Sequence, residues 1–205
     1  MGRHIDASCK QCRREGEKLF LKGERCYTEK CSYSRRSFAP GQHGKLPTRV
    51  SEYQIRLRAK QKARRIYGLG ERQFSSYFWE ASLQKGDTGA KLLEFLERRL
   101  DNVVYRLGFT TSRQSARQMV KHGGIFVNQK KVNIPSFRVK QGDVILVLPK
   151  REKMAKQALE KFPDRVTPPW LSLSGEIEGK VVSVPKREEI ESSIEENLII
   201  EYYSR

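Results

Sequence analysis

The four cysteines of the chain lie close together, in a spacing that suits a metal site. They form two pairs, with two residues between the thiols of the first pair and four between those of the second, at Cys9, Cys12, Cys26 and Cys31. A structural zinc ion takes four such thiolates in a tetrahedron, and its binding energy folds segments that are too short for a core. We therefore predict a zinc knuckle. The alternatives are an iron–sulfur cluster on the same cysteines, a redox pair at Cys9 and Cys12, or four free thiols.

Basic residues greatly exceed acidic ones, and the excess is uneven along the chain. The 205 residues include 41 Lys and Arg against 24 Asp and Glu, a net charge of +17. The excess is +7 in residues 1–50, +5 in 51–75 and +7 in 101–150, whereas 76–100 is neutral and 151–205 carries −2. Solubility alone needs a charge of only about 2–8. The pattern therefore indicates a polyanionic partner, bound with release of counterions from its phosphates.

Two basic segments before residue 75 are candidates for phosphate contacts. A loop rich in glycine and proline over 32–50 precedes a predicted helix from Ser51 to Tyr67, and another helix is expected near 71–85. Six cations on the first helix, with only Glu52 against them, would repel one another unless an anion lay alongside. A solvated linker is the alternative for the loop, and Phe74, Tyr77, Phe78 and Trp79 are expected in a core. The candidate contacts are Arg35, Arg36, His43, Lys45, Arg49, Arg56, Arg58, Lys60, Lys62, Arg64, Arg65 and Arg72.

Residues 90–150 are predicted to form two helices followed by short strands. Leucine and valine recur at spacings of three and four from Ala90 to Leu107, and a shorter helix spans Arg113 to His122. The shorter helix repeats basic residues at every fourth position, and its N-terminus suits an anion. Such a surface fits the backbone of A-form RNA, although a solvated helix face is the alternative. The candidate contacts here are Ser112, Arg113, Arg117, Lys121 and His122.

Membrane insertion and secretion are not expected from the composition. The sequence has no apolar run long enough to cross a bilayer, and its first 20 residues are too charged for a signal peptide. We therefore expect a cytoplasmic protein with no membrane partner and no small-molecule substrate.

Several motifs resemble the bacterial small-subunit ribosomal protein four family. Two segments, RLDNVVYRLG at 99–108 and GIFVN at 124–128, resemble the RNA-binding domain named after that family. Four further segments resemble the ribosomal protein itself: FAPGQHG at 38–44, KARRIYG at 62–68, ERQF at 71–74 and NLIIEYYSR at 197–205. The likeness runs along the whole chain, and the four cysteines resemble the zinc-carrying version of the family.

The resemblance implies a fold and a role. The fold would be α+β: a mainly helical first domain with an N-terminal four-cysteine metal knuckle, and an inserted helix–turn–helix–β RNA-binding domain. The domains would be 1–50, the knuckle and basic loop; 51–89, a helical domain completed by 181–205; and 90–180, the inserted domain. The protein would bind small-subunit ribosomal RNA first, nucleate assembly of its 5′ domain at a multi-helix junction, and touch ribosomal protein five of that subunit. It would also influence the accuracy of translation, and Lys45 and Arg49 would contact mRNA where it enters the ribosome.

Two other functions use the same features. An RNA-modifying enzyme would need a catalytic constellation, but residues 151–205 include no Cys or His and only one Asp. A zinc-containing DNA-binding regulator would need base-reading side chains on a recognition helix, which Gln114 and Gln118 leave possible. We expect a structural RNA-binding protein with no enzyme activity.

Overall fold

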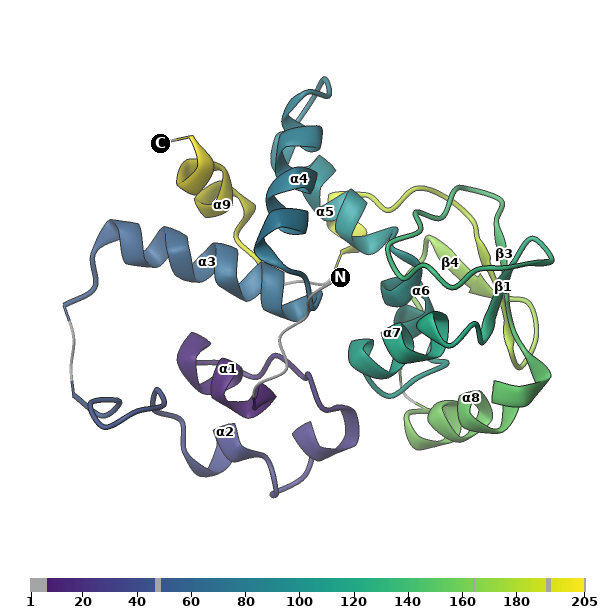
Figure 1. Ribbon diagram of the computed structural model, residues 1–205, viewed down its shortest axis with the longest axis horizontal. Coiled ribbons are helices and arrows are strands. Elements are labelled where there is room, and N and C mark those ends of the chain that lie inside the picture. The colour runs from purple at the N-terminus through teal and green to yellow at the C-terminus, as the bar shows by residue number, and fades with distance from the viewer. Residues whose placement is uncertain (1–6, 47–48, 164, 191–192, 205) are drawn as a thin grey trace. The chain divides into compact units, whose positions relative to one another are not determined.

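The chain folds as two compact units, and the computed structural model describes residues 7–46, 49–163, 165–190 and 193–204. The first unit comprises Met1–Gly89 and Ser192–Arg205, and the second Ala90–Glu191 (Figure 1). The predicted α+β class is confirmed, with a helical first unit and a sheet in the second. The expected boundary at 180 would cut strand β5 (Glu178–Val181), whereas the second unit extends beyond it. No helix in the described residues is both long and apolar enough to cross a membrane.

Helices of the first unit come from both parts of the sequence that it includes. They are α1 (Ser8–Glu15), a 3-10 turn (Gly23–Cys26), α2 (Ser32–Arg35), α3 (Glu52–Ile66), α4 (Glu71–Ser82) and α9 (Glu196–Tyr203). The predicted start of α3 is correct, because the Ser51 hydroxyl accepts a hydrogen bond from the Gln54 N–H at 3.2 Å. Helix α9 lies beside α3 (Figure 1). Helix α9, from the end of the sequence, thus packs on α3.

Aromatic side chains form part of the core of this unit. Phe74, Tyr77 and Phe78 of α4 are buried, as expected, and Phe78 stacks on Tyr203 of α9 with ring centres 4.4 Å apart. The expectation of a core position is wrong for Trp79, which is 55% exposed. It occupies the rim of a pocket instead, since the apolar face of α4 is already filled by its neighbours.

The long helix predicted from Ala90 to Leu107 is interrupted. Helix α5 (Thr88–Glu97) and helix α6 (Leu100–Arg106) are separated by Arg99, whose backbone is extended (φ −67°, ψ 135°). Around the break, the Leu100 N–H donates to the Phe137 carbonyl at 2.8 Å and the Val139 N–H donates to the Arg98 carbonyl at 3.0 Å. Pairing with a remote segment therefore overrides the local helical pattern, which side-chain spacing alone does not reveal.

An antiparallel sheet covers the helices of the second unit. Its strands are β1 (Ile125–Val127), β2 (Lys130–Lys131), β3 (Val144–Val147), β4 (Leu171–Leu173) and β5, in the order β2-β1-β3-β5-β4. Side chains from α6, from α7 (Arg113–Lys121) and from one sheet face form the core around the fully buried Trp170. Helix α8 (Pro149–Lys161) and the last two strands were not predicted. The hairpin tip is at Asn128 and Gln129.

A glycine in β5 allows the sheet to approach α6 closely. A Cβ at Gly179 would lie 2.6 Å from a methyl group of Leu107, which is buried. At Gly175, beside the same strand, the nearest atom would be 3.9 Å away. The absence of a side chain therefore matters at only one of these two positions.

We predict that Gly179→Ala destabilises the second unit by about 1–3 kcal/mol, the usual cost of overpacking. Gly175→Ala, the matched control, should change stability by less than about 0.5 kcal/mol. Urea unfolding followed by Trp170 fluorescence, in a Trp79→Phe background, measures both. Equal stabilities of the two variants would contradict the close packing.

Candidate nucleic-acid interface

The cations of α3, predicted to face RNA, are paired with carboxylates inside the first unit. The pairs are Arg56 with Glu52 and Glu201, Arg58 and Arg65 with Glu15, Lys60 and Arg64 with Glu71, and Lys62 with Glu17. None of the six cations is fully exposed. The expectation that Glu52 alone opposes them is wrong, because the other partners come from distant parts of the sequence. Repulsion along α3 is therefore relieved without an external anion.

The most buried of these acids, Glu15, joins α1 to α3. Its side chain is 1% exposed, receives a hydrogen bond from Arg65, and lies 3.6 Å from the Arg58 guanidinium. Burial raises the pKa of Glu15 despite the attraction of both arginines, and burial also lowers the pKa of Arg65. The cost of desolvation thus outweighs the attraction between these charges. The pair mainly fixes the orientation of the two helices.

The other predicted contacts of the first unit stay at its surface. They lie at the end of α2, in the segment that follows it or near the start of α4, and all are exposed: Arg35, Arg36, His43, Lys45, Arg49 and Arg72. Except for Arg72, they belong to the glycine-containing loop that the sequence singled out. The exposed cations of this unit therefore lie mainly on that loop and on the cysteine segment, rather than on α3. In the cysteine segment they are Lys10, Arg14, Lys18, Lys22, Arg25 and Lys30.

Two arginines of α1 hold the basic loop against the cysteine segment. The Arg13 Nε donates to the Phe38 carbonyl at 2.9 Å, and the Arg14 guanidinium donates to the Pro40 carbonyl at 3.2 Å. The Arg13 guanidinium and the Lys45 ammonium each lie 5.0 Å from the centre of the Phe38 ring. The geometry of the loop therefore depends on the fold of the cysteine segment.

All four cysteines line one small cavity. It has a volume of about 10 Å³, close to the room for one water-sized sphere. The described residues include no group of three or more His, Cys, Asp or Glu already gathered closely enough to hold an ion. The thiols are free, and the Lys22 N–H donates to Cys26 Sγ at 3.4 Å. Their shared cavity and soft sulfur donors fit zinc, although the sulfurs are not drawn together.

The thiols differ in their environment. Burial raises the pKa of Cys12 and of Cys26, opposed by backbone N–H groups that donate to each sulfur. At Cys31 burial also raises the pKa, but the N–H groups of Ser34 and Tyr33 outweigh it, so the pKa is lowered. Such N–H donors stabilise the thiolate form, which is the form that binds metals.

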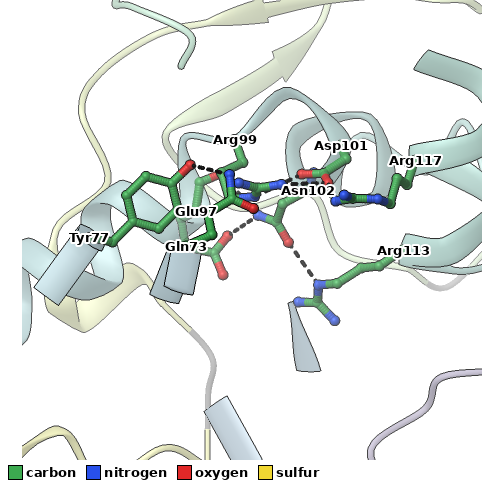
Figure 2. Close-up of polar contacts among 8 residues, drawn as sticks. All are labelled: Gln73, Tyr77, Glu97, Arg99, Asp101, Asn102, Arg113 and Arg117. Atoms are coloured by element: carbon green, nitrogen blue, oxygen red, sulfur yellow. Dashed lines mark hydrogen bonds and ion pairs between the residues drawn. The ribbon is translucent and has the colours of Figure 1, made fainter. Parts of the chain in front are cut away.

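A buried polar network positions the start of α7 in the second unit. The Asn102 amide nitrogen donates to Glu97 Oε2 at 2.7 Å, and its oxygen accepts from Arg113 Nε at 2.8 Å (Figure 2). Glu97 also receives two hydrogen bonds from Arg106, at 2.8 and 3.0 Å. The Arg113 guanidinium lies 4.5 Å from the centre of the Tyr105 ring. The network therefore holds Arg113 against α6.

Asp101 is the second carboxylate of this network and binds two arginines. Arg99, which is fully buried, donates to both of its oxygens at 3.1 and 2.9 Å, and Arg117 donates at 3.0 Å (Figure 2). The four arginines and two acids of the network carry a formal charge of 4 − 2 = +2. The two predicted contacts Arg113 and Arg117 are therefore held in place, and the network as a whole remains positive.

The remaining predicted contacts lie at the two ends of α7. Ser112 is 5% exposed, and its hydroxyl accepts the Ser115 N–H at 3.2 Å, so it is an N-cap. Lys121 and His122, at the other end, are exposed. The row of basic residues expected along α7 is thus solvated at its C-terminal end and held by α6 at its N-terminal end.

Comparison with known proteins covers both units. Residues 3–97 match the model of the ribosomal protein S4/S9 N-terminal domain, and residues 98–145 match the S4 domain. A small ribosomal subunit protein uS4 from Desulforamulus reducens is 56% identical over 208 residues, with all of both chains covered. Proteins of the same name from Nitratidesulfovibrio vulgaris and Dictyoglomus thermophilum are each 53% identical, also over the full length of both chains.

The chain belongs to the uS4 family of small ribosomal subunit proteins. Its match to the S4 domain includes α6, α7, β1 and β2, and therefore most of the polar network. The N-terminal match of this uS4 chain includes the cysteines, the basic loop and α3.

Sequence reasoning missed the acids that organise both candidate surfaces. Glu15, Glu17, Glu71 and Glu201 in the first unit, and Glu97 and Asp101 in the second, were not singled out. Their partners are up to 145 positions away in the sequence, as for Arg56 and Glu201. The one local signal was a pair of acidic residues, with Glu97 just before the RLDNVVYRLG motif and Asp101 within it, because charges within an apolar helical pattern must find partners.

We predict that Asp101→Ala destabilises the second unit by about 3–5 kcal/mol, because it removes the carboxylate that binds the fully buried Arg99. Glu160→Ala, which removes an exposed acid of α8, is the control and should cost less than about 0.5 kcal/mol. Thermal unfolding monitored by circular dichroism gives both values. A loss below about 1 kcal/mol for Asp101→Ala would show that Arg99 tolerates the change.

Proposed function

We propose that the chain is a structural component of the small ribosomal subunit, in the cytoplasm, that binds ribosomal RNA and catalyses no reaction. The observation that carries this is identity above 50%, over the full length of both chains, to proteins named small ribosomal subunit protein uS4. The match to the S4 domain, an RNA-binding domain, and the net charge of +17 agree with it.

We divide the basic residues between two roles. The exposed cations of the basic loop at 32–50, together with Arg72, Lys121 and His122, contact phosphates. Those of α3 chiefly hold the first unit together, since each already faces a carboxylate. Arg113 and Arg117 present a fixed positive surface to RNA, because their network orients them before binding.

The family suggests finer roles in the ribosome. We propose primary binding at a multi-helix junction that nucleates assembly of the 5′ domain, contact with ribosomal protein five of the same subunit, and a contribution to accuracy. Lys45 and Arg49, exposed on the basic loop, are the candidates for contact with mRNA at its entrance.

We also propose that Cys9, Cys12, Cys26 and Cys31 hold a structural zinc ion. The common cavity and the N–H groups that donate to the sulfurs support this. Zinc would supply the cross-link that a segment with so few buried apolar residues otherwise lacks. An iron–sulfur cluster on the same cysteines remains the alternative.

We predict that Arg35→Ala with Arg36→Ala lowers the log–log salt slope of binding to a 5′-domain RNA fragment by about two. Each lost phosphate contact removes roughly 0.9 from the slope. The control, Arg58→Gln with Lys62→Gln, should keep the slope, because these cations face acids. Filter binding over a range of salt concentrations measures it. The reverse pattern would assign the RNA surface to α3.

We predict that the chain purifies with about one zinc ion, and that Cys12→Ser loses it. Helix α1 and the basic loop that it holds should then become sensitive to protease, whereas the second unit should stay resistant. Mass spectrometry of the metal and of the cleavage sites measures both effects. Iron with visible absorption would favour the cluster, and a metal-free, protease-resistant wild type would contradict both.

A further inference from the structure

The outer face of the sheet in the second unit has apolar side chains that its core does not use. Side chains alternate along each strand, and Ile125, Ile145 and Val147 point into the core with α6 and α7. Phe126 and Leu146, which are directly opposite each other, therefore face the other way. A sheet with one solvated face normally has polar residues there. The exception indicates a binding surface.

A groove of about 620 Å³ lies on this face. It is lined by Phe126, Asn128, Gln129, Val144, Leu146 and Glu178. Its size falls within the usual range of ligand sites, about 300–1,000 Å³. Lys180, which is exposed, lies directly opposite Val144 in the neighbouring strand. The groove thus combines an aromatic ring and an apolar floor with one acid and one adjacent cation.

The hairpin tip at the edge of the groove has an unfavourable residue. Asn128 and Gln129 have φ of +47° and +66°, a turn that favours Asn followed by Gly. Asn128 is fully used in the fold, because it donates to Asp143 at 2.8 Å and accepts from the Val144 N–H at 2.9 Å. A left-handed Gln costs about 1 kcal/mol or more. Such strain at an exposed position points to a functional use of Gln129.

We propose that this groove binds one unstacked base of single-stranded RNA. The base stacks on Phe126 above Val144 and Leu146, as bases do on aromatic residues of sheet-based RNA-binding domains. The Gln129 amide hydrogen-bonds to the base, and the Lys180 ammonium pairs with the flanking phosphate. The inference rests on the proposed function in that it takes RNA as the ligand.

Glu178 gives the site a preference among bases. Its carboxylate accepts hydrogen bonds but does not donate them, so it favours an exocyclic amino group. Cytosine and adenine have such a group, and uracil does not. The site should therefore bind oligocytidine more tightly than oligouridine, and Glu178→Gln should remove the difference.

The test measures the full chain against short unstructured oligocytidine and, in parallel, against a structured 5′-domain RNA fragment, by fluorescence anisotropy. Phe126→Ala should weaken oligocytidine binding about tenfold or more, as for loss of one base–aromatic stack. Phe126→Tyr, which keeps an aromatic ring, should retain oligocytidine binding. Lys180→Gln should weaken it severalfold, whereas Lys153→Gln, on an exposed face of α8, should not.

Gln129→Gly separates binding from folding. Glycine relieves the left-handed strain, so the variant should unfold at higher urea concentration and yet bind oligocytidine severalfold more weakly. Unchanged oligocytidine binding by both Phe126→Ala and Gln129→Gly would overturn the inference and assign the face to a protein partner. If the wild type bound the structured fragment, the proposed function would stand in that case. Failure to bind either RNA would overturn the proposed function itself.

Discussion

Repulsion between like charges is the constraint that shapes this protein. In a chain with a net charge of +17, close packing of arginines away from water requires acids between them, because like charges repel. The first unit meets this condition with glutamates from three other segments arranged around α3. The second meets it with two buried carboxylates: Asp101 binds Arg99 and Arg117, and Glu97 receives two hydrogen bonds from Arg106. In both units, the few acidic residues decide where the many basic ones can lie.

This arrangement divides the cations into two populations. Those that face carboxylates are partly buried and have little freedom, so they define the shape of the protein. Those on the basic loop at 32–50 and at the end of α7 remain in water, where they can displace the counterions of RNA phosphates at little cost. Arg113 and Arg117 lie between these groups, since each binds a neighbour within the unit and still belongs to a cluster with excess positive charge.

Much of the fold could be predicted from local patterns. The helices at 52–66, 71–82 and 113–121 follow from apolar spacing and from the caps Ser51 and Ser112, and the strand at 125–127 from its β-branched residues. The break at Arg99 could not be predicted, because it depends on backbone pairing with residues 137–139. Helix α8 was missed because its proline, at the first helical position, equally suits the end of the preceding strand.

The candidate site was less predictable than the fold. Side-chain type identified every cation, but not which of them pairs with an acid, because that depends on contacts such as Arg56 with Glu201. The cysteine cluster was easier to predict, because the spacing of the two pairs indicated one shared site, and all four thiols line one cavity. The apolar outer face of the sheet could not be predicted either, because a three-residue strand such as Ile125–Val127 is too short to show a clear alternation of apolar and polar side chains.

The discontinuity of the first unit has a consequence for biogenesis. Helix α9, which packs beside α3, is translated only after the entire second unit. The nascent second unit, which is continuous in sequence, can therefore fold while α3 still waits for its partner. Until then, Arg56 lacks Glu201 and the aromatic rings of α4 lack Tyr203, so the first unit completes its packing only after the last helix of the chain has been made.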